Sequence, residues 1–177
     1  MKTLKLFIIA FAVALFASCT KPAADNKQPA ATAGSNERPP IASTDVVKAT
    51  PEELTLAKGA SGYASVRLQI QNGYHINANP PSYPYLKATE LELKPGAGIS
   101  VDFVKYPDPL TKNFSFNPDG PLKVYESEVL VKPMLTAAQS AAIGKHNLSA
   151  TLRVQACDDQ VCYAPGTIDL TIPVTVK

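Results

Sequence analysis

Two cysteines, Cys157 and Cys162, enclose the segment Asp158-Asp159-Gln160-Val161 near the end of this 177-residue chain. Sulfur atoms this close in the sequence are able to form a disulfide, which either exchanges electrons with another protein or only ties a loop. The third cysteine, Cys19, lies at the end of an apolar N-terminal run, where it has a different role. Function therefore depends on what this one pair does.

The N-terminus predicts export from the cytosol. Two lysines precede an apolar run over residues 6–17, which is shorter than the roughly 20 residues that span a bilayer but suits the core of a signal peptide. Phe16-Ala17-Ser18-Cys19 resembles a lipobox, so we expect residues 1–19 to be a lipoprotein signal peptide and Cys19 to be lipidated. Ordinary secretion without a lipid is the alternative. Because Thr20 rather than Asp follows Cys19, the sequence favours sorting to the outer membrane.

Composition changes after the signal peptide. Residues 20–43 are rich in Ala, Pro, Asn, Lys and Ser, and Ile41 is their only large aliphatic residue. Such a segment buries too little apolar surface to offset its ordering entropy, so we expect a disordered tether. Residues 44–177 then form one domain, large enough to fold without a disulfide. Outside the cytosol, its cysteine pair can stay oxidised.

The mature chain carries no net charge. Removal of residues 1–19 takes away two lysines and leaves 15 basic and 15 acidic residues. Because phosphate recognition needs a basic field, this balance argues against a nucleic-acid partner. The sequence also contains no phosphate loop or nucleophile triad, and we expect no cofactor.

Hydrophobic and polar residues alternate along three segments, residues 64–70, 148–156 and 167–176. A period of two is typical of half-buried strands. Weaker strand patterns cover residues 53–57, 86–93, 99–106 and 128–132, with proline and glycine clusters between them. Many short strands with such turns predict an all-β fold, an antiparallel β-sandwich of immunoglobulin type. Only residues 137–143, after the N-cap candidate Thr136, favour a short helix.

The alternation also predicts where the cysteines lie. If Leu152, Val154 and Ala156 face the core, Cys157 faces solvent, because successive side chains of a strand point to opposite sides. We therefore expect the pair at the rim of the sandwich, within reach of another protein. As a cross-link, a loop this small adds only about 2 kcal/mol in the chain-entropy model, so it is a weak staple.

Three segments resemble the N-terminal periplasmic domain of the DsbD family of thiol:disulfide interchange proteins: Gly73-Tyr74-His75-Ile76-Asn77, Val124-Tyr125-Glu126 and VQACDDQVCYAP over residues 154–165. The resemblance extends over nearly all of residues 44–177 and implies an immunoglobulin-like sandwich. It also implies that the domain passes reducing equivalents from a thioredoxin-like or membrane electron-transfer protein to oxidised envelope proteins. By the same resemblance, Cys162 forms the mixed disulfide with a partner and Cys157 resolves it. Because the family's membrane helices and thioredoxin-like domain do not follow, we expect a stand-alone module.

The family covers its sulfurs with a cap motif, an acidic pair followed by two aromatic residues and a glycine, which is absent here. The nearest substitute is residues 113–120, where Phe114 and Phe116 share a face if the chain is extended. These two rings either shield the sulfurs or are ordinary core residues. Tyr163, directly after the second cysteine, is a third candidate for shielding or for a partner-facing rim.

Asp158 and Asp159 lie between the sulfurs and are candidates for tuning the pKa of the cysteines. Nearby negative charge disfavours a thiolate, so we expect slow exchange with small thiols. Alternatively, both are solvated turn residues. His75 and His146 lack the spacing of zinc ligands, and we expect no metal site. His146 is expected in the turn over residues 144–147, and His75 as a structural residue near the site.

The sequence thus favours a thiol-disulfide exchange module, anchored by a lipid on Cys19 and facing the periplasm. Two alternatives stay open. One is a noncatalytic binding or assembly lipoprotein whose disulfide only pins a turn. The other is metal delivery through the reduced Cys157 and Cys162.

Overall fold

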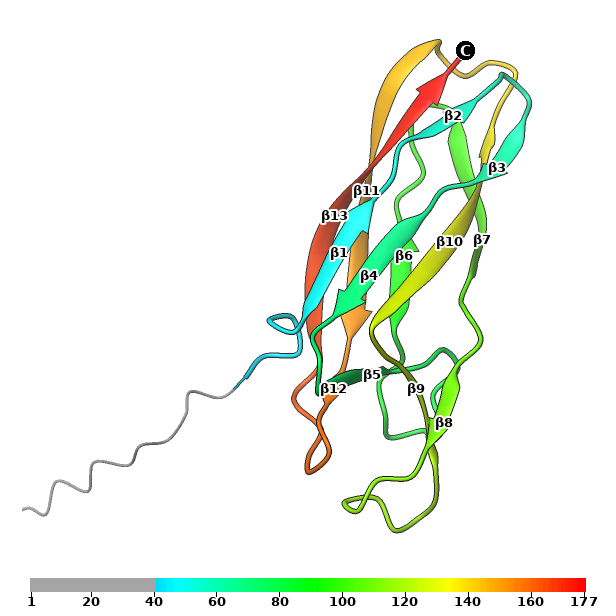
Figure 1. The fold of residues 1–177 in the computed structure, drawn as a ribbon. Coiled ribbons are helices and arrows are strands. Elements are labelled where there is room, and N and C mark those ends of the chain that lie inside the picture. Colours follow the sequence, from blue (N-terminus) through cyan, green and yellow to red (C-terminus); the bar gives the residue numbers. More distant parts are fainter. Residues whose placement is uncertain (1–40) are drawn as a thin grey trace, which may run out of the picture. The chain divides into compact units, whose positions relative to one another are not determined.

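The computed structural model describes residues 41–177, an all-β domain without a helix in this range (Figure 1). The predictions for the signal peptide, for Cys19 and for residues 20–40 of the linker lie outside these residues. Within the described range, no helix is long and apolar enough to cross a membrane. The strands are β1 (Val47–Pro51), β2 (Leu54–Leu56), β3 (Ser61–Tyr63), β4 (Val66–Ile70), β5 (His75–Asn77), β6 (Glu90–Leu93), β7 (Ile99–Lys105), β8 (Leu110–Lys112), β9 (Leu122–Tyr125), β10 (Glu128–Ala137), β11 (Gly144–Val154), β12 (Ala156–Cys157) and β13 (Gly166–Val176).

Two sheets form the sandwich. The first has the strand order β1-β4-β10-β3, and β7 also pairs with β10. The second has the order β2-β13-β11-β6, in which only the β13–β2 pair is parallel. The predicted all-β sandwich is confirmed, and the three strongly alternating segments overlap β4, β11 and β13 over most of their length.

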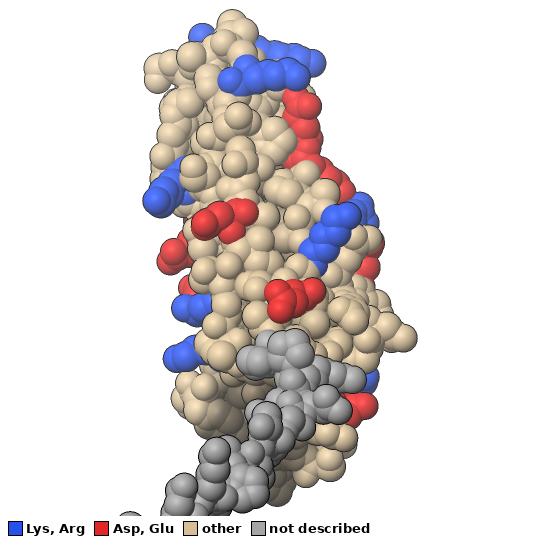
Figure 2. Space-filling view, turned by 90° about the vertical axis from the view of Figure 1, so that its left-hand side faces the viewer, with Lys and Arg blue, Asp and Glu red and all other residues tan. Residues whose placement is uncertain are grey.

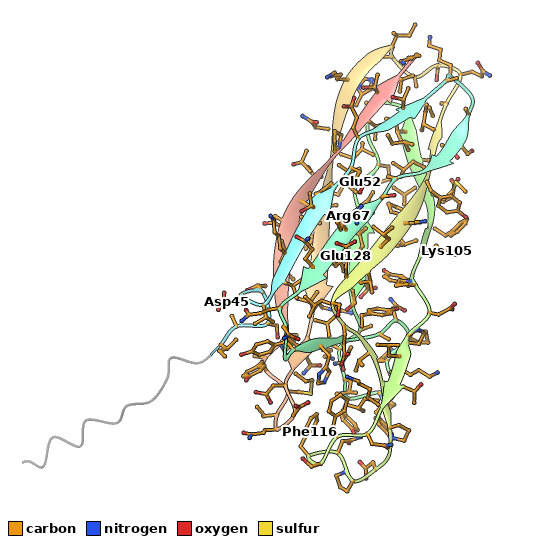
Figure 3. The ribbon with its side chains drawn as sticks, viewed as in Figure 1. Asp45, Glu52, Arg67, Lys105, Phe116 and Glu128 are labelled. Carbon is orange, nitrogen blue, oxygen red and sulfur yellow. A yellow bond between two sulfur atoms is a disulfide. The ribbon has the colours of Figure 1, made fainter. Side chains whose placement is uncertain are left out.

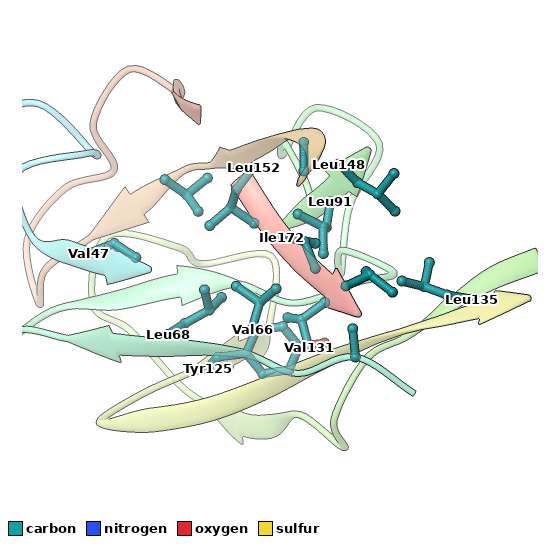
Figure 4. Close-up of a cluster of buried hydrophobic side chains, with 14 of the residues drawn as sticks. Val47, Val66, Leu68, Leu91, Tyr125, Val131, Leu135, Leu148, Leu152 and Ile172 are labelled. Carbon is teal, nitrogen blue, oxygen red and sulfur yellow. The ribbon is translucent and has the colours of Figure 1, made fainter. Parts of the chain in front are cut away.

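Inward-facing side chains of the two sheets meet in one core (Figure 4). Leu68 of β4, Leu152 of β11 and Ile172 of β13 are each 0 % exposed. Every second residue of a strand points inward, which produces the alternation seen in the sequence. Burial of these aliphatic groups is the main source of the domain's stability.

A third sheet, with the order β12-β5-β9-β8, lies at the end of the domain away from the C-terminus (Figure 1). The chain leaves the second sheet at Val154, the last residue of β11, and joins the third sheet at Ala156. Cys157 follows at once and pairs with His75 of β5. Because β11 is long and ends just before Cys157, the first cysteine lies at the end of the sandwich.

Two local predictions are wrong. The short helix expected over residues 137–143 does not form, because Ala137 pairs with Ile99 as the last residue of β10. A segment this short gains too few hydrogen bonds as a helix to compete with an existing ladder. His146 lies in β11, paired with Val174, rather than in a turn. Its Nε2 atom is 2.7 Å from the carbonyl oxygen of Ala142.

The end of the expected linker belongs to the folded domain. Ile41 packs against the core, and Ser43 is 0 % exposed. The Ser43 hydroxyl donates a hydrogen bond to the Ala164 carbonyl oxygen (2.6 Å) and accepts one from the Ala156 amide (2.9 Å). Because Ala156 precedes the first cysteine and Ala164 follows the second, Ser43 joins the two segments that bracket the cysteine loop.

Candidate redox site

Cys157 and Cys162 form a disulfide, and their Cα atoms are 3.9 Å apart. The two residues oppose each other in an isolated β-bridge. Backbone hydrogen bonds close the loop on both sides of the bridge, from the Asp158 amide to the Val161 carbonyl (2.9 Å) and from the Tyr163 amide to the Ala156 carbonyl (2.8 Å). The expected proximity of the two sulfurs is confirmed, and the loop is held even without the sulfur bond.

The two cysteines differ in exposure. Cys157 is 0 % exposed, whereas Cys162 is half-buried. The predicted outward orientation of Cys157 is therefore wrong. Cys157 points inward because the chain changes sheet at Gln155, so the alternation along β11 does not continue into β12. A partner approaching from solvent meets Cys162 first.

Gln155 fixes this change of sheet, a role that sequence analysis did not find. Its side-chain oxygen accepts hydrogen bonds from the Lys87 amide (2.8 Å) and from the Asn77 side chain (3.0 Å). Its side-chain nitrogen donates to the Tyr163 carbonyl oxygen (3.2 Å). A single glutamine in an alternating strand gives no signal of such a role, since the partners come from distant parts of the sequence.

Asp158 anchors the cysteine loop. Its carboxylate accepts hydrogen bonds from the amides of Gln160 (2.8 Å) and Val161 (2.9 Å) and from the Tyr163 hydroxyl (2.5 Å). The Tyr163 hydroxyl, followed by the backbone donors, lowers the pKa of Asp158. Asp159, in contrast, is exposed. The first aspartate is thus a turn-forming residue as well as a local negative charge.

His75 lies beside the buried cysteine. It is the cross-strand partner of Cys157, is 2 % exposed, and its Nε2 atom has no hydrogen-bond partner. Burial lowers the pKa of His75, which favours the neutral imidazole. The Phe114 ring stacks on the imidazole with centroids 4.1 Å apart and an angle of 18° between the planes.

Phe114 and Phe116 lie in a small satellite core close to the cysteine loop, and their role as a shield stays a prediction. They stack on each other with centroids 5.4 Å apart and pack against a small hydrophobic cluster of Leu86, Leu122 and Val124. The loop that carries them also contacts the cysteine loop, because the Ser115 hydroxyl donates to the Asp159 carbonyl oxygen (3.4 Å). Phe116 lies at the end of the domain that holds the third sheet (Figure 3). Tyr163 packs on the main core, and its ring lies 6.1 Å from that of Tyr74.

Charged residues near the site include both signs, with Lys112, Glu126, Asp158 and Asp159 all acting on His75. Within residues 41–177, no group of three or more His, Cys, Asp or Glu side chains is placed to hold a metal ion. On the face shown in Figure 2, basic and acidic side chains are interspersed.

The fold agrees with that of known proteins. The family model that matches this chain describes the N-terminal part of thiol:disulfide interchange protein DsbD and covers residues 44–172. The comparison with curated proteins gave no match.

Solved structures with a similar fold include the reduced N-terminal domain of DsbD from Neisseria meningitidis. It shares 17% sequence identity, the alignment covers 76% of this chain and 90% of that chain, and the TM-score is 0.50. The N-terminal periplasmic domain of ScsB from Proteus mirabilis shares 19% identity over 71% of this chain and 44% of that chain, with a TM-score of 0.49. Because the family model spans most of the sequence, this chain belongs to the family of DsbD N-terminal domains.

Proposed function

We propose that this domain is a thiol-disulfide exchange module of the bacterial cell envelope. It passes reducing equivalents between a thioredoxin-like or membrane electron-transfer protein and oxidised envelope proteins. The observation that carries the proposal is the asymmetric disulfide at one end of the sandwich, with Cys162 half-buried and Cys157 buried. The electrons travel on the two sulfur atoms, so the exchange needs no cofactor.

Cys162, the more accessible of the two cysteines, reacts first. A thiolate of the donor attacks Sγ of Cys162, the disulfide breaks, and its electron pair leaves on Sγ of Cys157. The donor's second thiol then displaces Cys162 from the mixed disulfide, which leaves the domain reduced and the donor oxidised. Toward an oxidised envelope protein the roles reverse. Cys162 attacks the substrate disulfide, and Cys157 resolves the mixed disulfide that results.

The surroundings of the pair restrict which thiols can react. Phe114 covers His75, and the loop that carries Phe114 and Phe116 contacts the cysteine loop at Asp159. These rings shield the sulfurs from one side, and the carboxylates of Asp158 and Asp159 disfavour a nearby thiolate. Small thiols therefore react slowly, and a docked partner that displaces the aromatic loop reacts faster.

The N-terminus ties this chemistry to a membrane. The lipobox-like Phe16-Ala17-Ser18-Cys19 supports a lipid anchor on Cys19, and Thr20 favours the outer membrane. Residues 20–40 then link the anchor to a domain that faces the periplasm.

Trapping a mixed disulfide tests the function. In a Cys157→Ser variant that also carries Cys19→Ser, as does its matched control, Cys162 is first labelled with thionitrobenzoate, and a single-cysteine form of a thioredoxin-like protein is added. We expect a stable mixed disulfide through Cys162, detected by non-reducing electrophoresis and mass spectrometry. The matched Cys162→Ser variant should form none, because Cys157 is buried.

A binding or assembly lipoprotein with a structural disulfide gives a different result. It would form no mixed disulfide faster than an unrelated labelled thiol does, and both variants would keep their partner. The wild-type oxidised domain adds a kinetic control, because the chain contains no tryptophan. Any change in tryptophan fluorescence during exchange then comes from the partner.

A further inference from the structure

A row of three residues crosses the third sheet at the disulfide. Cys157 pairs with His75 in the ladder between β12 and β5, and with Cys162 in the isolated bridge. Directly opposed residues of antiparallel strands project from the same face, with Cβ atoms about 4.5–5.5 Å apart. The His75 imidazole therefore neighbours the Cys157 side chain on the side away from Cys162.

The row continues to a carboxylate. Ile76 pairs with Tyr125 and Asn77 with Val124, so the next position of this register places Glu126 opposite His75. Glu126 forms an ion pair with Lys112 (2.5 Å), and both residues line a cavity of about 180 Å³ together with His75 and Asp159. Carboxylate, imidazole and sulfur thus follow one another across the sheet, an order that activates nucleophiles in many enzymes.

The imidazole is held in place and has an unused nitrogen. Phe114 stacks on its face, and the strand pairing of β5 fixes its backbone on both sides. Nε2 is buried and has no hydrogen-bond partner in the oxidised domain. Buried polar atoms without a partner are rare, and this one lies in the residue next to a sulfur that must gain or lose a proton during exchange.

We infer that His75 is the general base of the exchange reaction, and that its Nε2 takes the proton from the Cys157 thiol as this sulfur attacks. The inference rests on the proposed function, in which Cys157 resolves the mixed disulfide formed by Cys162. It adds a catalytic residue to the two cysteines.

In the resolving step, Cys157 attacks the mixed disulfide between Cys162 and the partner. The S–H bond of Cys157 breaks as Nε2 takes the proton, and Sγ of Cys157 bonds to Sγ of Cys162. The bond between Cys162 and the partner's sulfur breaks, and its electron pair leaves on the partner as a thiolate. The domain's two thiols are oxidised to a disulfide and the partner's disulfide is reduced. The proton on His75 returns to solvent, and the partner's thiolate takes one up.

The charges around His75 decide when it can accept a proton. Burial is the largest influence and lowers the pKa of His75. Glu126, Asp159 and Asp158 act in the opposite direction, whereas Lys112 lowers the pKa further. The net result is a neutral ring at about pH 7, which is the state that a base requires.

A two-step release of a coloured thiol tests this assignment without any protein partner. The reduced full-length chain, carrying Cys19→Ser so that only the two site thiols react, is mixed with one equivalent of dithiobisnitrobenzoate. Attack by Cys162 releases the first thionitrobenzoate, and attack by Cys157 on the mixed disulfide releases the second. Stopped-flow absorbance separates the two phases, and the second phase reports the step assigned to His75.

We expect His75→Gln to slow the second phase on the order of a hundredfold at neutral pH and to change the first phase little. The wild-type second phase should be nearly independent of pH between the titrations of His75 and of the thiol. The variant should instead slow about tenfold for each pH unit below the thiol titration, because only the spontaneous thiolate reacts. His146→Gln, at the other histidine of the chain, is the matched control and should behave as wild type.

His75→Phe keeps a ring against Phe114 and serves as a second variant, and cooperative unfolding verifies that each variant is folded. If either folded variant, His75→Gln or His75→Phe, keeps the second-phase rate and pH dependence of the wild type, the inference is overturned. Absence of the first phase in the wild type would instead contradict the exchange function itself. The two failures are therefore distinguishable.

Discussion

Some residues around the disulfide hold the cysteine loop by hydrogen bonds, and others contribute mainly charge. Asp158 binds two backbone amides and the Tyr163 hydroxyl, so its carboxylate holds the loop in shape. Asp159 is exposed and contributes mainly its charge. Gln155 and Ser43 bind the backbone on either side of the cysteines. The loop is thus organised by polar contacts that do not depend on the sulfur bond.

The buried imidazole of His75 predicts that acid destabilises the domain. Its pKa in the folded state is below the ordinary value of 6.5, so the unfolded chain binds the proton first as the pH falls. Stability should be highest above pH 6.5 and should decrease as the pH falls from there through the lowered pKa. Urea unfolding across this range should show that slope in the wild type and a smaller one in His75→Gln.

The contribution of Asp158 appears at lower pH. Its pKa is lowered from 3.8, so its stabilising effect is complete above that value and is lost only as the pH falls below it. The two groups therefore act in separate pH windows. An equal slope above pH 3.8 in the wild type and in His75→Gln would contradict the assignment of that window to His75.

At the level of strands, the sequence predicts the sandwich well and the site less well. β4, β11 and β13 follow from alternation alone, because every second residue faces the core, from Leu148 onward in β11 and from Ile168 onward in β13. β10 is predicted only to residue 132, but it extends to Ala137 by pairing with β7. The position of Cys157 could not be predicted, because the switch from β11 to β12 depends on pairing with β5, which lies far away in the sequence.

The segment before β1 acts as a strap on the cysteine loop. Ser43 is buried and binds the backbone of Ala156 and Ala164, so Ser43→Ala leaves the buried Ala156 amide without this partner and removes the contact to the Ala164 carbonyl. We expect a loss of about 1–3 kcal/mol in the free energy of unfolding. We also expect faster alkylation of Cys157 in the reduced domain, because its strand is held less firmly.

Ser61→Ala is the matched control for this strap. The Ser61 hydroxyl also makes a hydrogen bond, to Thr136, but at an exposed position. Its loss should cost less than about 0.5 kcal/mol and leave the alkylation of Cys157 unchanged. Equal effects of the two substitutions, measured by urea unfolding and by mass spectrometry of the alkylated thiols, would show that Ser43 is not a strap.

Across the whole domain, most of the main core lies between the first and second sheets, and the third sheet, which holds the redox site, adds only Ile76, Tyr125 and Ala156 to its buried residues. The large hydrophobic side chains that join the first and second sheets supply most of the buried apolar area, whereas the disulfide belongs to the third sheet at one end. Residues 20–177 carry equal numbers of basic and acidic side chains, and the face shown in Figure 2 mixes both signs of charge. Recognition of a partner therefore depends on the cysteine end and its aromatic loop rather than on a long-range field.

This separation predicts that the domain stays folded when its disulfide is opened. The cross-link closes a loop with a sequence separation of only 5, so the chain-entropy model assigns it about 2 kcal/mol. Coupling between folding and disulfide formation is reciprocal. Because the disulfide adds little to the stability of the fold, the fold adds equally little to the stability of the disulfide, so the bond stays easy to reduce. In urea, the Cys157→Ser/Cys162→Ser double variant should unfold in one cooperative step, about 2 kcal/mol less stable than the oxidised wild type, with a similar denaturant slope. A variant that loses cooperative unfolding would instead show that the disulfide is structural, because a carrier of electrons must remain folded in both of its states.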